Sequence, residues 1–191
     1  VFRLVNAPSS QRVVGPLPWS PPVPIPAWWN DLPDDLPVAY VSMGSSGRQA
    51  LSGPIARVLV DAGFRVLVTA APDAVIEHPA VHAAKFMPGD LACERASVVI
   101  CNGGSPTSQQ ALAAGKPVIG VASNLDQFLN MRALEHAGLG VTLRADRFSA
   151  QETAAAALRG IEDEAWRLRT TRVGVEIGGL DAAKTILGDL R

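Results

Sequence analysis

The feature that most constrains the fold of this chain is residues 98–121, which read VVICNGGSPTSQQALAAGKPVIGV. Residues 98–101 and 118–121 are short apolar runs of the kind that form strands buried on both faces of a parallel sheet. Between them lies a glycine pair, followed by a helix-forming stretch that ends at Gly115. This order predicts a βαβ unit, in which a helix connects two parallel strands.

The turn between the first strand and the helix has the composition of a binding loop. Gly103 and Gly104 have no Cβ, so they can adopt positive φ and let a ligand approach the backbone closely. Ser105 is expected to cap the helix, and Pro106 suits the first helical position because its missing N–H is not needed there. The free N–H groups and the positive end of the helix dipole then point into the crevice beyond the strands, which favours a phosphate.

A plain strand-to-helix turn without a ligand is the alternative interpretation, since α/β proteins contain several such turns. A second polar cluster favours binding. The loop after residues 118–121 carries Ser123, Asn124, Asp126 and Gln127. We expect it to face the same crevice, because the carboxyl ends of parallel strands lie at one edge of a sheet.

The rest of the chain shows the same alternation of strands and helices. We expect strands at 38–43, 64–69 and 82–86, and helices at 48–62, 90–96 and 126–137. Gly63 is expected to end the first of these helices and Gly138 the last. Alanine-rich helices are expected from Ser149 onward. The pattern predicts an α/β fold with a doubly wound, Rossmann-like parallel sheet.

Two stretches of the chain resemble a known family. Residues 86–140 combine a Phe-Met-Pro segment, the Gly-Gly-Ser turn, an amide on the next helix, an Ala-Gly-Lys-Pro strand entry and Asp-Gln before an Asn-bearing helix. Residues 38–47 read VAYVSMGSSG. This pattern resembles the C-terminal, nucleotide-sugar donor-binding domain of GT-B glycosyltransferases of the UDP-glycosyltransferase-like family. The resemblance implies one half of a GT-B fold. Together with its N-terminal domain it implies metal-independent, inverting transfer of a hexose from a UDP- or dTDP-sugar.

The resemblance also implies which residues contact each part of the donor. The expected contacts are the base with Phe86, Met87 and Pro88, the ribose with Gln110, the sugar hydroxyls with Asp126 and Gln127, and the diphosphate with Gly44, Ser45, Ser46, Asn102, Gly103, Gly104, Ser105 and Thr107. Asp126 is also a candidate N-cap for the helix that follows it. No catalytic residue is expected in this chain, because the family's general base comes from the N-terminal domain. The chain alone is therefore expected to bind the donor without turning it over.

Two positions depart from the pattern of the family. Asn102 stands where His is usual, and Gln110 stands where Glu is common. An Asn side chain can donate a hydrogen bond to a phosphate but carries no charge, so only part of that contact is retained. A Gln side chain keeps an acceptor for the ribose and adds a donor.

The N-terminal part of the chain reads as a connector. Eight of the fifteen prolines lie within residues 16–37, which predicts an extended, polyproline-like segment. With the family resemblance, this predicts a Pro- and Trp-rich interdomain linker at 1–37, a donor-binding domain at 38–191 and an N-terminal acceptor domain outside this chain. Trp19, Trp28 and Trp29 lie in the linker, and exposed aromatic side chains usually pack on something. Either the linker clamps its own domain, which is favoured for Trp28 and Trp29, or it lines the cleft toward a partner domain.

Composition and cysteine usage narrow the class of function. The formal net charge of -1 gives no sign of nucleic-acid binding. Cys93 and Cys101 lack CxxC spacing, which indicates reduced thiols in the cytoplasm, and no transmembrane segment is expected. The histidines do not stand at ligand spacing from these cysteines, so we expect no metal and no cofactor besides the nucleotide-sugar substrate. The GxSxG, P-loop and GxGxxG patterns are absent from the sequence.

Two further functions remain open at this stage. A nucleotide-sugar epimerase or hydrolase half would share the fold, but it would need acid–base carboxylates and histidines facing the sugar. A non-catalytic interaction module would keep the fold without the chemistry, and the Asn102 substitution is its best support. For the donor-binding domain and for the interaction module alike, the expected partner is the missing N-terminal domain or a separate chain.

Overall fold

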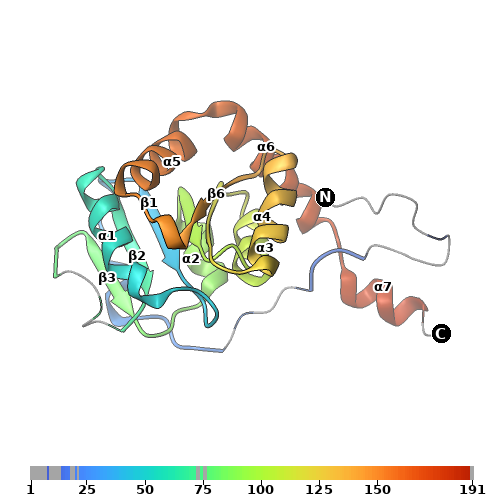
Figure 1. Cartoon of the computed structure of the whole chain (residues 1–191). Coiled ribbons are helices and arrows are strands. Elements are labelled where there is room, and N and C mark those ends of the chain that lie inside the picture. Colours follow the sequence, from blue (N-terminus) through green and yellow to red (C-terminus); the bar gives the residue numbers. More distant parts are fainter. Residues whose placement is uncertain are drawn as a thin grey trace.

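One parallel sheet positions every part of the candidate site. The computed structural model describes residues 8, 14–17, 20, 22–71, 74 and 77–189. Within these residues, six parallel strands pair in the order β3-β2-β1-β4-β5-β6 (Figure 1). The strands are β1 (Val38–Ser42), β2 (Arg65–Thr69), β3 (Val81–Ala84), β4 (Val98–Cys101), β5 (Val118–Ala122) and β6 (Gly140–Arg144). The order reverses between β1 and β4, which makes that junction the switch point where open α/β sheets bind ligands.

Helices cover both faces of this sheet. The helices α1 (Ser52–Asp61) and α5 (Ala150–Glu162) lie on one face, and α2 (Gly89–Arg95), α3 (Ser105–Ala113) and α4 (Leu125–His136) lie on the other (Figure 1). The helix α6 (Glu164–Gly178) packs along α3, and α7 (Ala182–Asp189) follows at the margin of the domain. The described 3-10 turns are η1 (Ala27–Asp31), η2 (Gln49–Leu51) and η4 (Ala145–Arg147). The sequence-based expectation of a doubly wound, Rossmann-like α/β fold is confirmed.

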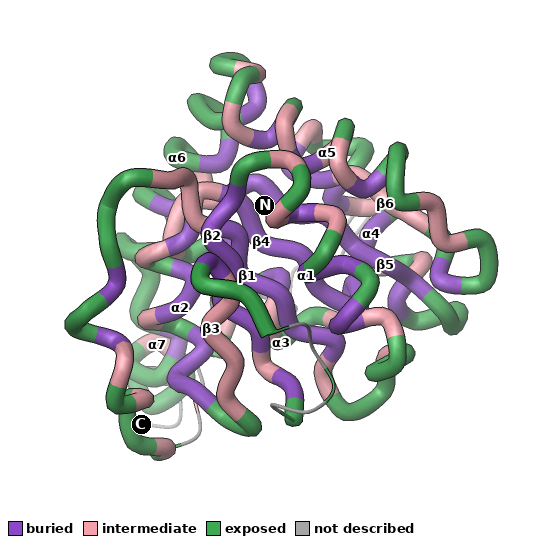
Figure 2. The backbone as a smooth tube through the Cα atoms, turned by 90° about the vertical axis from the view of Figure 1, so that its left-hand side faces the viewer, coloured by how far each residue is buried: buried purple, intermediate pink, exposed green. Residues whose placement is uncertain are grey.

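Alternate residues of the central strands enter two separate cores. In β4, Val98 and Ile100 pack on the side of α1 and α5, whereas Val99 and Cys101 pack on the side of α2, α3 and α4. All four residues are fully buried, and Figure 2 shows buried backbone running through the middle of the sheet. A strand covered on both faces must be apolar at every position, which is why this segment reads as a continuous apolar run.

The predicted strands and helices are confirmed to within one or two residues, with one exception. The segment predicted as one helix over 48–62 forms two elements. The 3-10 turn η2 comes first, and α1 begins only at Ser52. Pro54 explains the break, since a proline fits only the first turn of a helix. Gly63 and Gly138 end their helices as predicted, with φ of 87° and 67°.

Two predicted helix caps are wrong. Gly104, with φ of -73° and ψ of 154°, is the N-cap of α3, and Ser105 is the first helical residue and makes no capping bond. The N-cap of α4 is Asn124, whose side chain accepts from the backbone N–H of Gln127 at 3.0 Å. Asp126 therefore lies inside the first turn of α4, where its charge complements the helix dipole without capping the helix.

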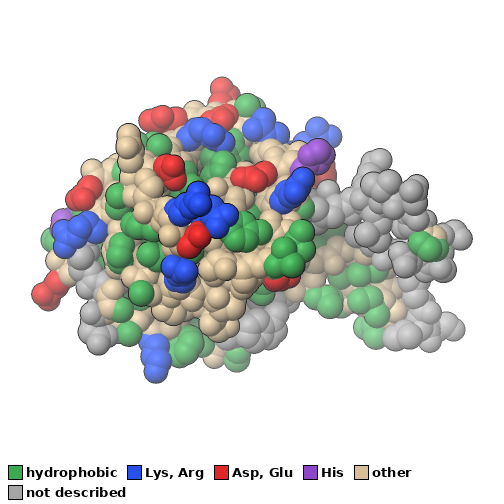
Figure 3. All heavy atoms as spheres, viewed as in Figure 1, with side chains coloured by type: hydrophobic (Ala, Val, Ile, Leu, Met, Phe, Trp, Pro, Cys, Tyr) green, Lys and Arg blue, Asp and Glu red, His purple; other side chains and the backbone are tan. Residues whose placement is uncertain are grey.

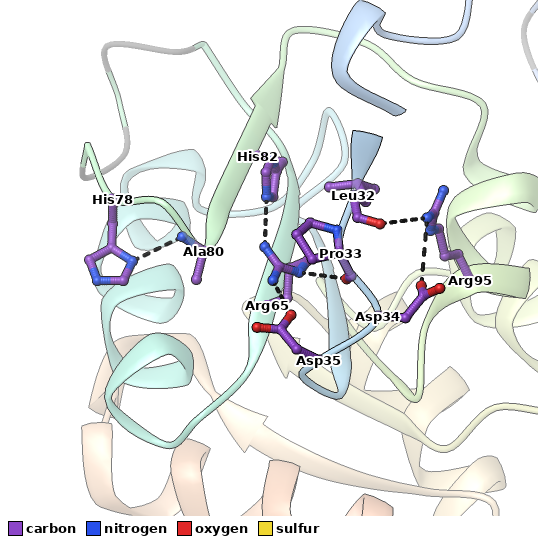
Figure 4. A network of polar contacts seen from close by, with 9 residues as sticks. All are labelled: Leu32, Pro33, Asp34, Asp35, Arg65, His78, Ala80, His82 and Arg95. Carbon is purple, nitrogen blue, oxygen red and sulfur yellow. Dashed lines mark hydrogen bonds and ion pairs between the residues drawn. The ribbon is translucent and has the colours of Figure 1, made fainter. Parts of the chain in front are cut away.

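Arg65 of β2 ties the segment before β1 to the edge of the sheet (Figure 4). Its buried guanidinium donates to the carbonyl oxygen of Pro33 (3.1 Å), contacts Nε2 of His82 (3.2 Å) and pairs with the carboxylate of Asp35. Hydrogen bonding to Arg65 lowers the pKa of Asp35. Burial and the nearby guanidinium charges of Arg65 and Arg95 lower the pKa of His82.

Arg95 of α2 holds the same segment from the other side. It donates to the carbonyl oxygen of Trp29 at 2.7 Å and to that of Leu32 at 3.4 Å, and its guanidinium lies over the Trp29 ring. The side chains of Trp29 and Leu32 are buried in the core beside α2. Trp28 packs on this core and against the His82 ring. The interpretation in which this segment clamps its own domain is confirmed for Trp28 and Trp29, whereas Trp19 lies outside the described residues.

The surface carries charges of both signs. Figure 3 shows acidic and basic side chains interspersed over one face of the folded domain. Among the described residues, no helix combines the length and the apolar character needed to cross a bilayer.

Candidate functional site

Three loops meet at the carboxyl edge of the sheet, beside the switch point. They are the loop after β1, the turn between β4 and α3, and the loop between β5 and α4. Because β1, β4 and β5 are adjacent in the sheet, their carboxyl ends lie side by side. Side chains from the three loops hydrogen-bond to one another, so the polar cluster after β5 and the glycine turn after β4 belong to one site, as the sequence predicts.

Asn102 bridges the turn after β4 to the loop after β1. Its Oδ1 accepts from the backbone N–H of Gly104 at 2.9 Å, and its Nδ2 donates to Oγ of Ser46 at 3.2 Å. The residue is only 6% exposed. A Cβ atom on Gly44, which has a φ of 56°, would lie 3.0 Å from Nδ2 of Asn102, so the loop is built closely around this amide.

Gln127 bridges the loop after β5 to the same serine. Its Oε1 accepts from the backbone N–H and the hydroxyl of Ser123, at 2.8 and 3.0 Å. Its Nε2 lies 3.3 Å from Oγ and 3.4 Å from the carbonyl oxygen of Ser46. The side chain is 1% exposed and lies within the protein, whereas its neighbour Asp126 is exposed.

The start of α3 is fixed by side chains of α4 and of α3 itself. Nδ2 of Asn130 donates to the carbonyl oxygen of Gly103 at 2.8 Å and to Oγ of Ser108 at 3.0 Å. Gly103 has a φ of 80°, and a Cβ atom there would lie 2.7 Å from Cγ of Met131. Ser105 is exposed and Thr107 half-buried, and no side chain among the described residues caps the helix. No side-chain cap therefore occupies the first-turn N–H groups of α3 at the carboxyl edge of the sheet, as a phosphate site requires.

The expected contacts of the base and of the ribose lie close together. Gln110 packs against Gly89, where a Cβ atom would come within 2.6 Å of its Oε1, and Gly89 directly follows the 86–88 segment. Gln110 also lines a cavity of about 310 Å³ together with Asp90 and Leu17. Phe86 is 62% exposed, whereas Met87 and Pro88 are buried. Of these three residues, only Phe86 offers an exposed side chain to a base.

Three polar residues that shape the site were missing from the expected contacts. Asn124 caps α4, and Asn130 and Ser108 hold the turn at Gly103. Asn124 was recognisable as an N-cap candidate from its residue type. Asn130 lies on a helix and Ser108 in the middle of another, and no local pattern indicates that their side chains meet.

Burial keeps both cysteine thiols in the neutral form. Both thiols are free and buried. Burial raises the pKa of Cys101 to about 11 and the pKa of Cys93 further still, so neither is a thiolate at neutral pH. Among the residues that the structure describes, no three His, Cys, Asp or Glu side chains are grouped so that they could hold a metal ion.

A parallel sheet with helices on both faces and a glycine turn leading into α3 at the switch point defines a Rossmann-like α/β domain, which is the fold of one half of a GT-B glycosyltransferase. The comparison with protein families agrees. The chain belongs to the family described as "Erythromycin biosynthesis protein CIII-like, C-terminal domain". The model of this family matches residues 56–183 of the chain.

The curated relatives that the chain matches are glycosyltransferases, and solved glycosyltransferase structures share its fold. It is 43% identical over 175 residues to a PGL/p-HBAD biosynthesis glycosyltransferase of Mycobacterium tuberculosis, covering 91% of this chain and 41% of the relative. It is 40% identical to a PGL/p-HBAD biosynthesis rhamnosyltransferase of Mycobacterium bovis, covering 91% and 39%. The structure of the glycosyltransferase VinC in complex with dTDP shares the fold, with a TM-score of 0.79, 17% identity and coverage of 96% and 48%. The chain spans about two fifths of the length of the curated relatives it matches.

Proposed function

We propose that this chain is the donor-binding part of a glycosyltransferase. The whole enzyme would transfer a sugar from a UDP- or dTDP-sugar to an acceptor, and this chain would bind the UDP- or dTDP-sugar. The observation that carries the proposal is the junction of three loops at the switch point, where Asn102 and Gln127 both reach Ser46 and the first turn of α3 opens toward the same crevice. The family and its glycosyltransferase relatives support it.

The proposed chemistry is displacement at the anomeric carbon with the nucleoside diphosphate as leaving group. Negative charge grows on the leaving diphosphate in the transition state, so donors already pointing at it lower the barrier. The loop containing Gly44, Ser45 and Ser46 and the N–H groups of Ser105 and Thr107 are such donors. We propose that these groups replace a metal ion, that the acceptor attacks with inversion, and that the general base belongs to a domain outside this chain. The chain alone is then inactive.

The remaining parts of the donor follow the same crevice. We propose that Phe86 covers the base, that the backbone of Met87 contacts its edge, and that Gln110 binds the ribose. The position of Gln110 against Gly89, next to the 86–88 segment, supports this arrangement. Asp126, exposed in the first turn of α4, is the proposed contact for the sugar hydroxyls.

Calorimetric titration of the 191-residue chain with UDP and dTDP tests this proposal. We expect saturable binding of at least one nucleotide, weakened about fivefold by Gln110→Ala and by Asn102→Ala because each removes hydrogen bonds at the site. Gln151→Ala, on the exposed start of α5, is the control and should leave the affinity unchanged. Addition of a chelator should not change binding. A folded chain that binds neither nucleotide would refute the proposal.

That outcome would favour a non-catalytic interaction module. One observation supports this second candidate: both polar ends of the Asn102 amide contact protein groups, Gly104 and Ser46. A histidine at this position would bring a ring that can be charged, whereas the amide here serves the architecture of the loops.

A further inference from the structure

The hydroxyl of Ser46 receives hydrogen bonds from two amides. Nδ2 of Asn102 approaches Oγ at 3.2 Å, and Nε2 of Gln127 approaches it at 3.3 Å. The two donors come after two different strands, β4 and β5. They are 56 and 81 residues from Ser46 in the sequence. A serine hydroxyl has two acceptor positions and one donor proton, so these two N–H groups fill both acceptor positions.

The direction of each amide is set by a backbone N–H group. Oδ1 of Asn102 accepts from Gly104 N–H at 2.9 Å, so the other end of that amide, facing Ser46, must be the NH₂. Oε1 of Gln127 accepts from Ser123 N–H at 2.8 Å, so its NH₂ also faces Ser46. A backbone N–H can only donate, and therefore neither amide can be turned around without losing its bond.

We propose that Asn102 and Gln127 are positioning residues that fix the Ser46 hydroxyl as a donor aimed into the crevice, toward a diphosphate oxygen of the nucleotide. With both acceptor positions filled, the O–H proton must point away from the two amides. Among the described residues, no group accepts it, and Ser46 is exposed. The partner of this proton must then offer an acceptor, and a phosphate oxygen is a strong, charged acceptor.

This inference rests on the proposed function and deepens it. It gives Gln127 a role different from the expected contact with the sugar hydroxyls. Its side chain is 1% exposed, and both ends of the amide already contact Ser123 and Ser46. It also explains how Asn102 can serve a phosphate site without a charge, because the residue acts through the proton of Ser46.

The test compares nucleotides with nucleosides, using NMR titration of the 191-residue chain with UDP, dTDP, uridine and thymidine. Ser46→Ala should weaken binding of the diphosphate about tenfold, as expected for a lost hydrogen bond to a charged group, and leave nucleoside affinity unchanged. Ser46→Thr, which keeps the hydroxyl, should restore the diphosphate affinity. Equal binding by Ser46→Ala and the unmodified chain would overturn the inference while leaving the proposed function standing.

The positioning role is tested by a double-mutant cycle. In Gln127→Glu one carboxylate oxygen still accepts from Ser123, and the other accepts the Ser46 proton and turns it inward. The added negative charge and the lost bond to the Ser46 carbonyl oxygen also weaken binding, so the same substitution is made in the Ser46→Ala background, where only these two effects remain. We expect a penalty about tenfold smaller in that background. Equal penalties in both backgrounds would overturn the inference.

Asn102→Asp provides a second route to the same reversal, because its carboxylate still accepts from Gly104 while its other oxygen accepts from Ser46. Its penalty should also shrink in the Ser46→Ala background. Melting temperatures of all variants establish that each is folded before its affinity is compared. If the unmodified chain binds neither diphosphate, the proposed function and this inference both fail.

Discussion

Alanine at two glycines of α6 should have opposite effects on stability. Gly174 is buried where α6 crosses the end of α3, and a Cβ atom there would lie 2.9 Å from the backbone N of Gly115, 3.0 Å from its Cα and 3.1 Å from the carbonyl oxygen of Ala113. Gly178, one turn later in the same helix, is exposed and has nothing within 4 Å of the corresponding position. The two sites therefore share helix and substitution and differ in the space available.

The magnitudes follow from two opposing contributions. Alanine in place of glycine favours a helix by about 1 kcal/mol. Overpacking typically costs about 1–3 kcal/mol, and the upper end applies at Gly174 because its three neighbours are backbone atoms that cannot rotate away. Gly174→Ala should therefore lower the free energy of unfolding by about 2 kcal/mol, which corresponds to a drop of about 4–8 °C in melting temperature. Gly178→Ala, at the last residue of the helix, should raise stability by up to about 0.5 kcal/mol.

Urea denaturation followed by circular dichroism measures both changes, with the m-value compared to verify that the unfolding transition is the same. The reasoning fails if Gly174→Ala is as stable as the unmodified chain, because α6 would then have room to move away from α3. It also fails if Gly178→Ala is destabilised as much as Gly174→Ala, because the loss would then not depend on packing.

Three further predictions concern other parts of the domain. Trp29→Ala should lower the free energy of unfolding by about 3 kcal/mol in urea denaturation, since it empties part of the core beside α2, and an effect on the scale of a surface substitution would contradict this packing. Because burial and Arg65 lower the pKa of His82 in the folded chain, the unfolded chain binds this proton more readily, so stability should decline as the pH falls through about 6.5. His82→Gln should flatten the pH dependence of the urea midpoint. Asn124→Ala should cost about 1 kcal/mol through loss of the α4 cap, whereas Asp126→Ala should cost much less, and the reverse order of melting temperatures would restore Asp126 as the cap.

Local rules predicted the elements of the fold because each signal lies within a few residues. The apolar run at 98–101, the following glycine pair and Gly115 identify a strand, a turn and a helix end without knowledge of the rest of the chain. The same rules failed at the caps, where two residues close together in the sequence are both acceptable N-caps. Gly104 is the N-cap of α3 because it, and not Ser105, has extended backbone angles.

The position of the candidate site could be predicted from the sequence, whereas many of its side-chain contacts could not. The carboxyl ends of β1, β4 and β5 follow from the strand order, and so does the crevice between their loops. Whether a polar side chain faces that crevice depends on partners distant in sequence. Gln127 is buried because Ser46 and Ser123 take both ends of its amide, and no pattern around residue 127 contains that information.

The arginine contacts of the segment before β1 determine about which part of the backbone a domain joined upstream could swing. Since Arg65 and Arg95 hold carbonyl groups of residues 29–33, and Trp29 belongs to the core, this segment must move with the sheet as one rigid body. A domain joined upstream would then swing about backbone that precedes Ala27. Pro22, Pro24 and Pro26 restrict φ in that stretch, and Pro26 has the extended angles of a polyproline helix, with φ of -59° and ψ of 146°. The hinge of such a two-domain protein would therefore be a semi-rigid segment with few free torsions, which would limit the range of angles between its two domains.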